Sequence, residues 1–108
     1  MMDISSIHPQ KFLEALDQQG LKDSIIIDVR EPHEWEYYHL EEAKLIPMQQ
    51  IPQRMGELPD DRDIYLVCAH GVRSYRVAEY LQENGIDRVI NVEGGMAAVA
   101  MLRGFQYD

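Results

Sequence analysis

Apolar and polar positions follow one another along the chain in blocks that switch between a helical and an extended period. Apolar residues at helical spacing over 12–16 follow Pro9, which suits the first turn of a helix because no N–H is needed there. Gly20 is a natural end for this helix. The β-branched run over 25–29 comes next and is typical of a strand covered on both faces.

The middle of the chain carries less regular patterns. A proline opens a short helical turn over 32–37, and residues 44–46 form a short strand that ends before another proline. Apolar residues then recur at helical spacing over 48–58, which predicts a helix with Pro52 in its first turn.

The remaining residues repeat the alternation of strand and helix. Apolar runs predict strands over 64–67 and 88–92. Between them, a helix begins at about Ser74 and ends at Gly85, and a last helix follows the double glycine within 94–102.

Strands separated by helices of this length form βαβ units, in which the strands are parallel and the helices cover both faces. We expect one domain over residues 1–108, with an α/β fold of three layers, α/β/α, around a mostly parallel sheet of about five strands. Ligands of such sheets bind at the carboxyl ends of the strands. The loops at 28–30, 68–73 and 93–95 leave strands at that edge, so a site is expected there.

Composition narrows the possible partners. Hydrophobic residues make up 45% and charged residues 27% of the 108 residues, which is typical of a globular domain. The net charge of -9 argues against binding to nucleic acids and to anionic membranes. A small anionic substrate stays possible, because a local field can oppose the net charge.

The single cysteine excludes an internal disulfide and suits a reducing compartment. The first ten residues lack the basic and apolar regions of a secretory signal, and no apolar run is long enough for a membrane span. We therefore expect a cytoplasmic protein.

The stretch around that cysteine is the strongest chemical feature. Free cysteines are most often inert buried residues, but Cys68 lies at a strand end and is followed by Gly71, which permits unusual backbone angles. The helix expected from Ser74 points its positive end into the loop, and Arg73 and His70 add positive charge. Such a loop favours a thiolate, so we interpret Cys68 as a nucleophile.

The size of the loop bears on what the nucleophile attacks. Cysteine phosphatases have five residues between their cysteine and arginine and usually a histidine before the cysteine. Here four residues, 69–72, separate Cys68 from Arg73, and the preceding residue is Val67. The shorter loop suits one extra sulfur atom on the cysteine better than a phosphate.

Three motifs resemble those of the rhodanese family of sulfurtransferases. The loop Cys68-x-x-Gly71-x-Arg73-Ser74 resembles its active-site loop, "IIIDVREPHEWEYYHLEEAKLIPM" resembles its second signature, and the double glycine at 94–95 matches one near the end of the family. The resemblance extends over about residues 4–102. Tyr38 replaces a glycine, Glu41 and Glu42 stand where a glycine is common, and Met96 replaces a tryptophan, which affects the expected acceptor specificity.

The resemblance implies a sulfurtransferase that works in two displacement steps without a metal or an organic cofactor. Cys68 would attack the outer sulfur of a donor such as thiosulfate and become a persulfide. The backbone amides of the loop would hold that persulfide, namely those of Ala69, His70, Gly71, Val72, Arg73 and Ser74. A thiol or a partner protein's cysteine would then accept the sulfur.

The charged residues near the loop either act on the donor or support the structure. His70 either helps to bind the donor or is an exposed loop residue, and Arg73 either meets the donor or pairs with a carboxylate, with pairing favoured. Arg30 is expected to support the structure by pairing with Glu34 or a neighbour. Asp28 is expected to accept backbone N–H groups of the loop.

Other kinds of site and function fit the sequence less well than sulfur transfer. The segment "HEWEYYH" lacks a zincin metal motif, because Tyr37 occupies the place of the second histidine. The acidic residues of 31–42 form a solvated face or select a partner protein. The alternatives in function are a persulfide carrier or regulatory protein-binding module with little turnover and, less favoured, a phosphatase or arsenate reductase on the same fold.

Overall fold

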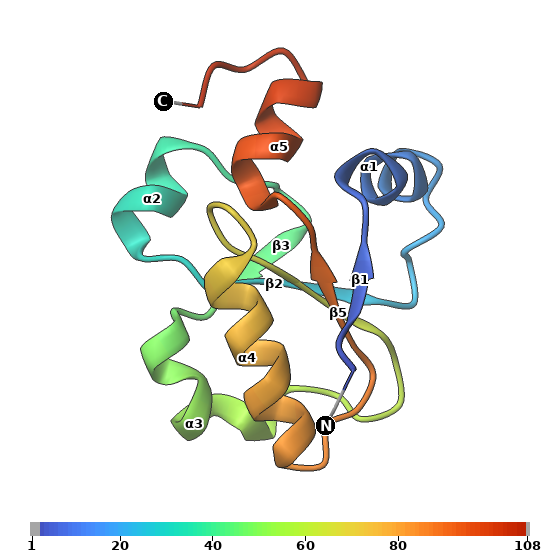
Figure 1. Cartoon of the computed structure of the whole chain (residues 1–108), viewed down its shortest axis with the longest axis vertical. Helices are drawn as coiled ribbons and strands as arrows, with labels where there is room; N and C mark the ends of the chain where they lie inside the picture. The colour runs from blue at the N-terminus through green and yellow to red at the C-terminus, as the bar shows by residue number, and fades with distance from the viewer. Residues whose placement is uncertain (1–2, 108) are drawn as a thin grey trace.

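The computed structural model describes residues 3–107 and contains one sheet with helices on both faces (Figure 1). Its five strands are β1 (Ser5–Ile7), β2 (Ile25–Asp28), β3 (Ala43–Leu45), β4 (Ile64–Val67) and β5 (Val89–Val92). They lie in the order β1-β5-β4-β2-β3, and all four neighbouring pairs are parallel. The expected α/β architecture with a parallel sheet is confirmed.

Helices on the two faces give the molecule its three layers. They are α1 (Pro9–Asp17), α2 (Pro32–Tyr37), α3 (Ile51–Arg54), α4 (Val72–Glu83) and α5 (Gly95–Leu102), with two 3₁₀ turns, η1 (Met48–Gln50) and η2 (Met55–Glu57). The side chains of α1 and α5 pack on one face of the sheet, and those of α3 and α4 pack on the other. Helix α2 lies at the edge of the molecule (Figure 1), and Tyr37 at its end contacts the rings of Phe105 and Tyr107 in the segment that follows α5.

Alternation along the central strands sends neighbouring residues into two separate cores. In β4, Leu66 lies in the core beneath α3 and α4, while Tyr65 and Val67 lie in the core beneath α1 and α5. Each fully buried aliphatic side chain contributes roughly 1.5–3 kcal/mol relative to an exposed one. Cys68 continues the alternation and belongs to the core on the α4 side, which fixes the direction of its side chain.

The helix expected over 48–58 is wrong as a single element. The chain forms η1, the four-residue α3 and η2 in succession. A helix from Met48 would need an N–H at Pro52 to bond the Met48 carbonyl, and proline lacks that donor and its ring crowds the carbonyl. The chain therefore restarts at Ile51, with Pro52 in the first turn of α3.

Two further differences concern short elements. Strand β1 was not predicted, because it has three residues of which two are exposed, so no apolar run marks it. Helix α4 begins at Val72, two residues before the expected start.

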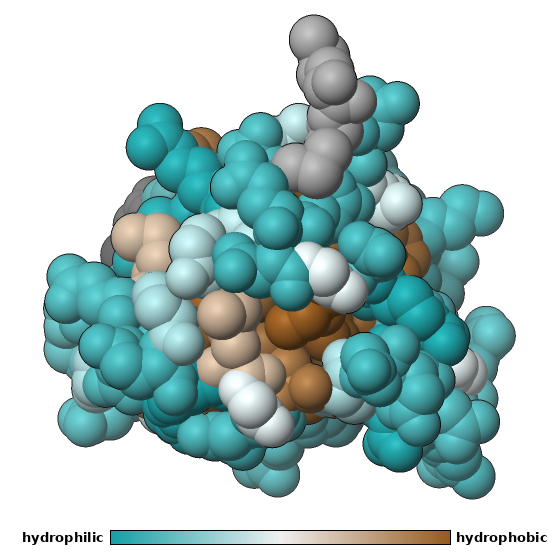
Figure 2. All heavy atoms as spheres, turned by 90° about the horizontal axis from the view of Figure 1, so that it is seen from below, coloured by the Kyte–Doolittle hydropathy of each residue, from teal (hydrophilic) through white to brown (hydrophobic). Residues whose placement is uncertain are grey.

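The face seen from below in Figure 1, on the side of α3 and the end of α4, is mostly hydrophilic, with a small hydrophobic area near its centre (Figure 2). Within residues 3–107, none of the helices combines the length and the apolar character needed to cross a bilayer.

Candidate active site

The three loops expected at the carboxyl edge of the sheet do meet there. Val29, just after β2, donates its N–H to the carbonyl of Val67 at 2.9 Å. At the start of α5, Met96 donates its N–H to the carbonyl of Cys68 at 2.7 Å, and the next amide donates to Ala69 at 3.0 Å. Backbone hydrogen bonds from both neighbouring loops thus fix the base of the cysteine loop.

Two glycines permit this close approach. Gly95 has a φ of +60°, and a Cβ there would lie 2.4 Å from the carbonyl oxygen of Cys68. Gly71 has a φ of +93°, and a Cβ there would lie 3.2 Å from the amide nitrogen of Gly94. Both positions combine a left-handed backbone with lack of space, so a side chain is excluded at Gly95 and strained at Gly71.

The Cys68 side chain is both buried and hydrogen-bonded. The residue is 1% exposed, as an inert cysteine would be. Its Sγ, however, receives the N–H of Gly71 at 3.1 Å and lies 3.2 Å from the hydroxyl Oγ of Ser74. These two contacts distinguish Cys68 from an ordinary apolar core residue.

The other amides of the loop are free to bind an anion. Within residues 3–107, the amides of Ala69, His70, Val72, Arg73 and Ser74 donate to no protein acceptor. Gly71 caps α4 in a left-handed conformation without a side-chain hydrogen bond, so the positive end of this helix faces the loop. The arrangement can stabilise a negatively charged sulfur atom bound to Cys68.

Arg73 pairs with a carboxylate, as favoured from the sequence. Its two terminal nitrogens donate to the two carboxylate oxygens of Glu34 in α2, at 2.9 and 2.8 Å. Hydrogen bonds from Arg73 lower the pKa of Glu34 to about 2, and the same pair raises the pKa of Arg73. The pair ties α2 to the start of α4 and so holds one side of the loop.

Arg30 pairs with a neighbour and not with Glu34, which is the second of the two partners expected from the sequence. Its guanidinium binds Asp28 through Nε and Nη2, at 2.9 to 3.1 Å and 2.8 Å, and is 0% exposed. Residues two apart in extended chain point to the same side, which brings Asp28 within reach, while Glu34 is occupied by Arg73. Burial opposes the charge, but Asp28 outweighs it and raises the pKa of Arg30.

Asp28 also accepts the backbone N–H of Arg30 at 3.0 Å. This is the type of hydrogen bond expected of Asp28, and the N–H belongs to the loop that follows β2. The remaining donors of Arg30 bind the carbonyl of Tyr38 and the hydroxyl of Tyr107, at 2.9 Å for the latter. The buried pair therefore joins the end of β2, the end of α2 and the C-terminal segment beside the site.

His70 is exposed on the rim of the loop and makes an edge-on contact with the Tyr107 ring, with centroids 6.3 Å apart. An open cavity of about 470 Å³ adjoins it, lined by His70, Ala97, Met101, Gly104, Phe105, Gln106 and Tyr107.

Asn91 in β5 is a site residue that the sequence analysis missed. It is 4% exposed, its Oδ1 lies 2.5 Å from Ser74 Oγ, and its Nδ2 donates to the Gly71 carbonyl at 3.2 Å. The sequence does carry a signal for it, because Asn91 is a polar residue within the apolar run of a strand. A buried polar side chain needs hydrogen-bond partners, so its neighbours must supply them.

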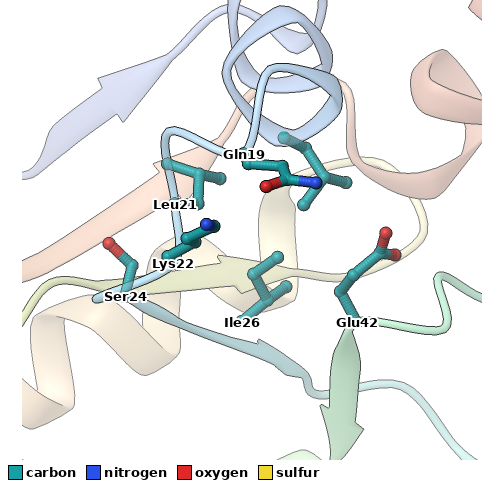
Figure 3. A pocket seen from close by; sticks show the side chains of 7 residues that line it. Gln19, Leu21, Lys22, Ser24, Ile26 and Glu42 are labelled. Atoms are coloured by element: carbon teal, nitrogen blue, oxygen red, sulfur yellow. The ribbon is translucent and has the colours of Figure 1, made fainter.

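A second open cavity, of about 460 Å³, lies away from Cys68 (Figure 3). It is lined by Leu16, Gln19, Leu21, Lys22, Ser24, Ile26 and Glu42, and Ile26 faces the core opposite to that of Cys68. In the described part of the chain, no three His, Cys, Asp or Glu side chains are grouped to hold a metal ion.

Comparison with known proteins found similar sequences and a similar structure. A family model described as a rhodanese-like domain matches residues 8–102. An uncharacterized protein, YqhL, from Bacillus subtilis is 37% identical over 87% of the chain and 78% of its own length, and a sulfurtransferase from Allochromatium vinosum is 39% identical over 81% and 83%. The crystal structure of a rhodanese-like domain protein from Staphylococcus aureus superposes with a TM-score of 0.81 at 42% identity, covering 89% of this chain and 91% of that one.

Proposed function

The chain belongs to the rhodanese-like domain family, and from that premise we propose that it is a sulfurtransferase that moves a sulfane sulfur from a donor such as thiosulfate to a thiophilic acceptor through a Cys68 persulfide. At the level of the family, relatives named sulfurtransferases support sulfur transfer. The observation that carries the proposal for this chain is the hydrogen-bonded Cys68 Sγ inside a loop of unpaired amides.

In the first step, the Cys68 thiolate attacks the outer sulfur of thiosulfate. A bond forms between Sγ and that sulfur, the sulfur–sulfur bond of thiosulfate breaks, and sulfite leaves with its electron pair. The negative charge ends on the outer sulfur of the persulfide, where the amides of 69–74 and the start of α4 stabilise it.

In the second step, a thiolate or another thiophile such as cyanide attacks the outer persulfide sulfur. The bond to Sγ breaks and returns the electron pair to Cys68 as a thiolate, so the enzyme is restored without an external oxidant or reductant. We propose a thiol or a partner protein's cysteine as the acceptor. A free catalytic thiol requires reducing conditions, so we propose that the protein acts in the cytoplasm.

Arg73 has a supporting role in this mechanism. Both of its terminal nitrogens are bound by Glu34, so its charge acts on the loop while its hydrogen bonds position α2. Asp28 and Arg30 support the floor of the site in the same way, because their hydrogen bonds are directed to each other and to neighbouring backbone.

A persulfide carrier with little turnover is the second candidate. At 1% exposure, Cys68 is shielded from bulk solvent, which favours storage of the sulfur until a specific partner reaches it. A phosphatase is disfavoured by the four residues between Cys68 and Arg73, because a tetrahedral anion needs a larger loop.

Turnover assays separate these functions. Formation of thiocyanate from thiosulfate and cyanide is measured beside hydrolysis of p-nitrophenyl phosphate, with the wild type and Cys68→Ser. We expect thiocyanate formation that Cys68→Ser abolishes and no phosphatase activity. Phosphate hydrolysis that depends on Cys68, or thiocyanate formation that survives Cys68→Ser, would overturn the proposal.

A further inference from the structure

The Ser74 hydroxyl lies between two atoms that can each accept its proton. Its Oγ is 3.2 Å from Cys68 Sγ and 2.5 Å from Asn91 Oδ1. A hydroxyl carries a single proton, so it donates to one of these atoms at a time. All three side chains are buried, so within the site no bulk water replaces the bond that is lost.

The orientation of the Asn91 amide decides where the proton lies at rest. Its Nδ2 donates to the carbonyl of Gly71, and turning the amide over would place two acceptor oxygens against each other there. The amide oxygen of Asn91 therefore faces Ser74. Two oxygens at this separation need a proton between them, and only Ser74 can supply it.

Cys68 consequently meets an oxygen lone pair of Ser74, not its proton. A lone pair is a good partner for a neutral S–H and a poor one for a thiolate. The N–H of Gly71 is then the donor that favours the thiolate. A second donor becomes available when the Ser74 proton turns to Sγ and leaves Asn91.

We propose that Asn91 is a positioning residue that competes with the Cys68 sulfur for the single proton of Ser74 and so sets how readily the thiol ionises. The inference deepens the proposed function, since Cys68 is its nucleophile. When the thiol ionises, the O–H of Ser74 turns from Asn91 to Sγ and donates its hydrogen bond there. When the persulfide forms, the negative charge moves to the outer sulfur, and the O–H of Ser74 turns back to Asn91.

Other charged groups surround the cysteine but leave this competition in place. Arg73 on α4 is bound to Glu34 of α2, His70 is exposed on the loop, and the Asp28 carboxylate at the end of β2 is bound to Arg30. Across residues 3–107, none of these groups hydrogen-bonds Sγ. These groups are the same in all the variants compared, and Ser74 with Asn91 provides the hydrogen bond that the variants change.

The test measures ionisation directly. Because the chain has one cysteine, the ultraviolet absorbance of the thiolate, corrected with Cys68→Ser, reports Cys68 alone. In Asn91→Leu, which keeps the volume and removes the competing oxygen, the midpoint of ionisation is expected to fall by about one pH unit. In Asn91→Asp, which accepts the proton more strongly and adds charge, the midpoint is expected to rise.

A second background separates positioning from mere packing. In Ser74→Ala, the further change Asn91→Leu is expected to leave the midpoint unchanged, because the shared hydroxyl is gone. Asn84→Leu is the matched control, since that exposed amide also donates to a backbone carbonyl, at the far end of α4. Circular dichroism shows that each variant compared is folded.

The inference is overturned if Asn91→Leu and Asn91→Asp shift the midpoint in the same direction or not at all, or if Asn91→Leu shifts it equally in the Ser74→Ala background. If Asn91→Leu does not fold, Asn91→Asp with and without Ser74→Ala decides alone, and a rise that is the same in both overturns it. The absorbance needs no sulfur donor, so failure of sulfur transfer in the wild type would refute the proposed function and leave this result standing.

Discussion

Two polar pairs leave consecutive residues in the first turn of α4 and differ in almost every property. Arg73 reaches out to Glu34 of α2 in a charged, bidentate and partly exposed pair. Ser74 reaches in to Asn91 of β5 through a neutral, buried hydrogen bond that also touches the sulfur. At this turn of α4, the charged pair lies where water still reaches it, and the neutral pair lies where desolvation of a charge would cost most. We infer that the outer pair positions the loop and that the inner pair controls Cys68.

Gly95→Ala is expected to break both pairs together and to have the largest effect. The new Cβ would lie 2.4 Å from the carbonyl oxygen of Cys68 in a left-handed backbone, so the loop must leave its place on α5. We expect a loss of about 3 kcal/mol or more in the free energy of unfolding, measured with urea. Gly56→Ala is the control, because nothing lies within 4 Å of that Cβ and no loss is expected. Equal stability of the two variants would show that the loop does not depend on this contact.

Breaking the outer pair alone is expected to have an intermediate effect. A double-mutant cycle of Glu34→Gln and Arg73→Gln is expected to give a coupling energy of about 1 kcal/mol. Turnover is expected to fall roughly tenfold in either variant because the loop loses one of its supports. Glu57→Gln removes two ion pairs, with Arg54 and with Lys44, that do not involve the cysteine loop, and it should leave turnover unchanged. A coupling near zero with normal turnover would remove the outer pair from the account.

The smallest expected effect is on the pH dependence of stability, which should differ between the charged pair and the neutral pair. The pKa of Glu34 is lowered from 4.5 to about 2 in the folded protein by hydrogen bonds from Arg73. A lowered carboxyl pKa stabilises the fold fully above the unfolded value, and the contribution disappears as the pH falls through the folded value. The stability difference between the wild type and Glu34→Gln should therefore be constant above about pH 5 and shrink toward pH 2.

The inner pair provides the control for that measurement. The difference between the wild type and Ser74→Ala in urea unfolding should stay constant over the same acidic range, because neither the hydroxyl nor the amide of Asn91 titrates there. A difference for Glu34→Gln that does not change with pH, or one that grows in acid, would contradict the assignment of the outer pair.

The same contrast shows what the sequence could predict. The strand before Cys68, the glycines at 71 and 95 and the order of motifs depend on local patterns, so the parallel fold and the place of the loop followed from them. The partner of Arg30 could not be chosen from the sequence, because Asp28 and Glu34 are both near Arg30 along the chain. Packing alone decides that Glu34 binds Arg73 and that Asp28 is left for Arg30. The role of Asn91 depends on a contact across 17 residues between β5 and α4.

Short elements escaped prediction for a different reason. Strand β1 is stabilised by its pairing with β5, and its own residues carry no apolar signal. The segment after β3 has helical spacing, but Pro52 limits it to turns that the spacing alone does not reveal. In both cases tertiary contacts or a missing donor outweighed the local pattern.

Intact mass spectrometry after incubation with thiosulfate tests the central claim most directly. The sulfur that Cys68 takes from the donor should appear as a gain of one sulfur atom in the wild type and be absent in Cys68→Ser. Subsequent addition of cyanide should remove it. A wild-type protein that gains no sulfur from thiosulfate, 3-mercaptopyruvate or a persulfide donor, or a gain that persists in Cys68→Ser, would contradict a persulfide at Cys68.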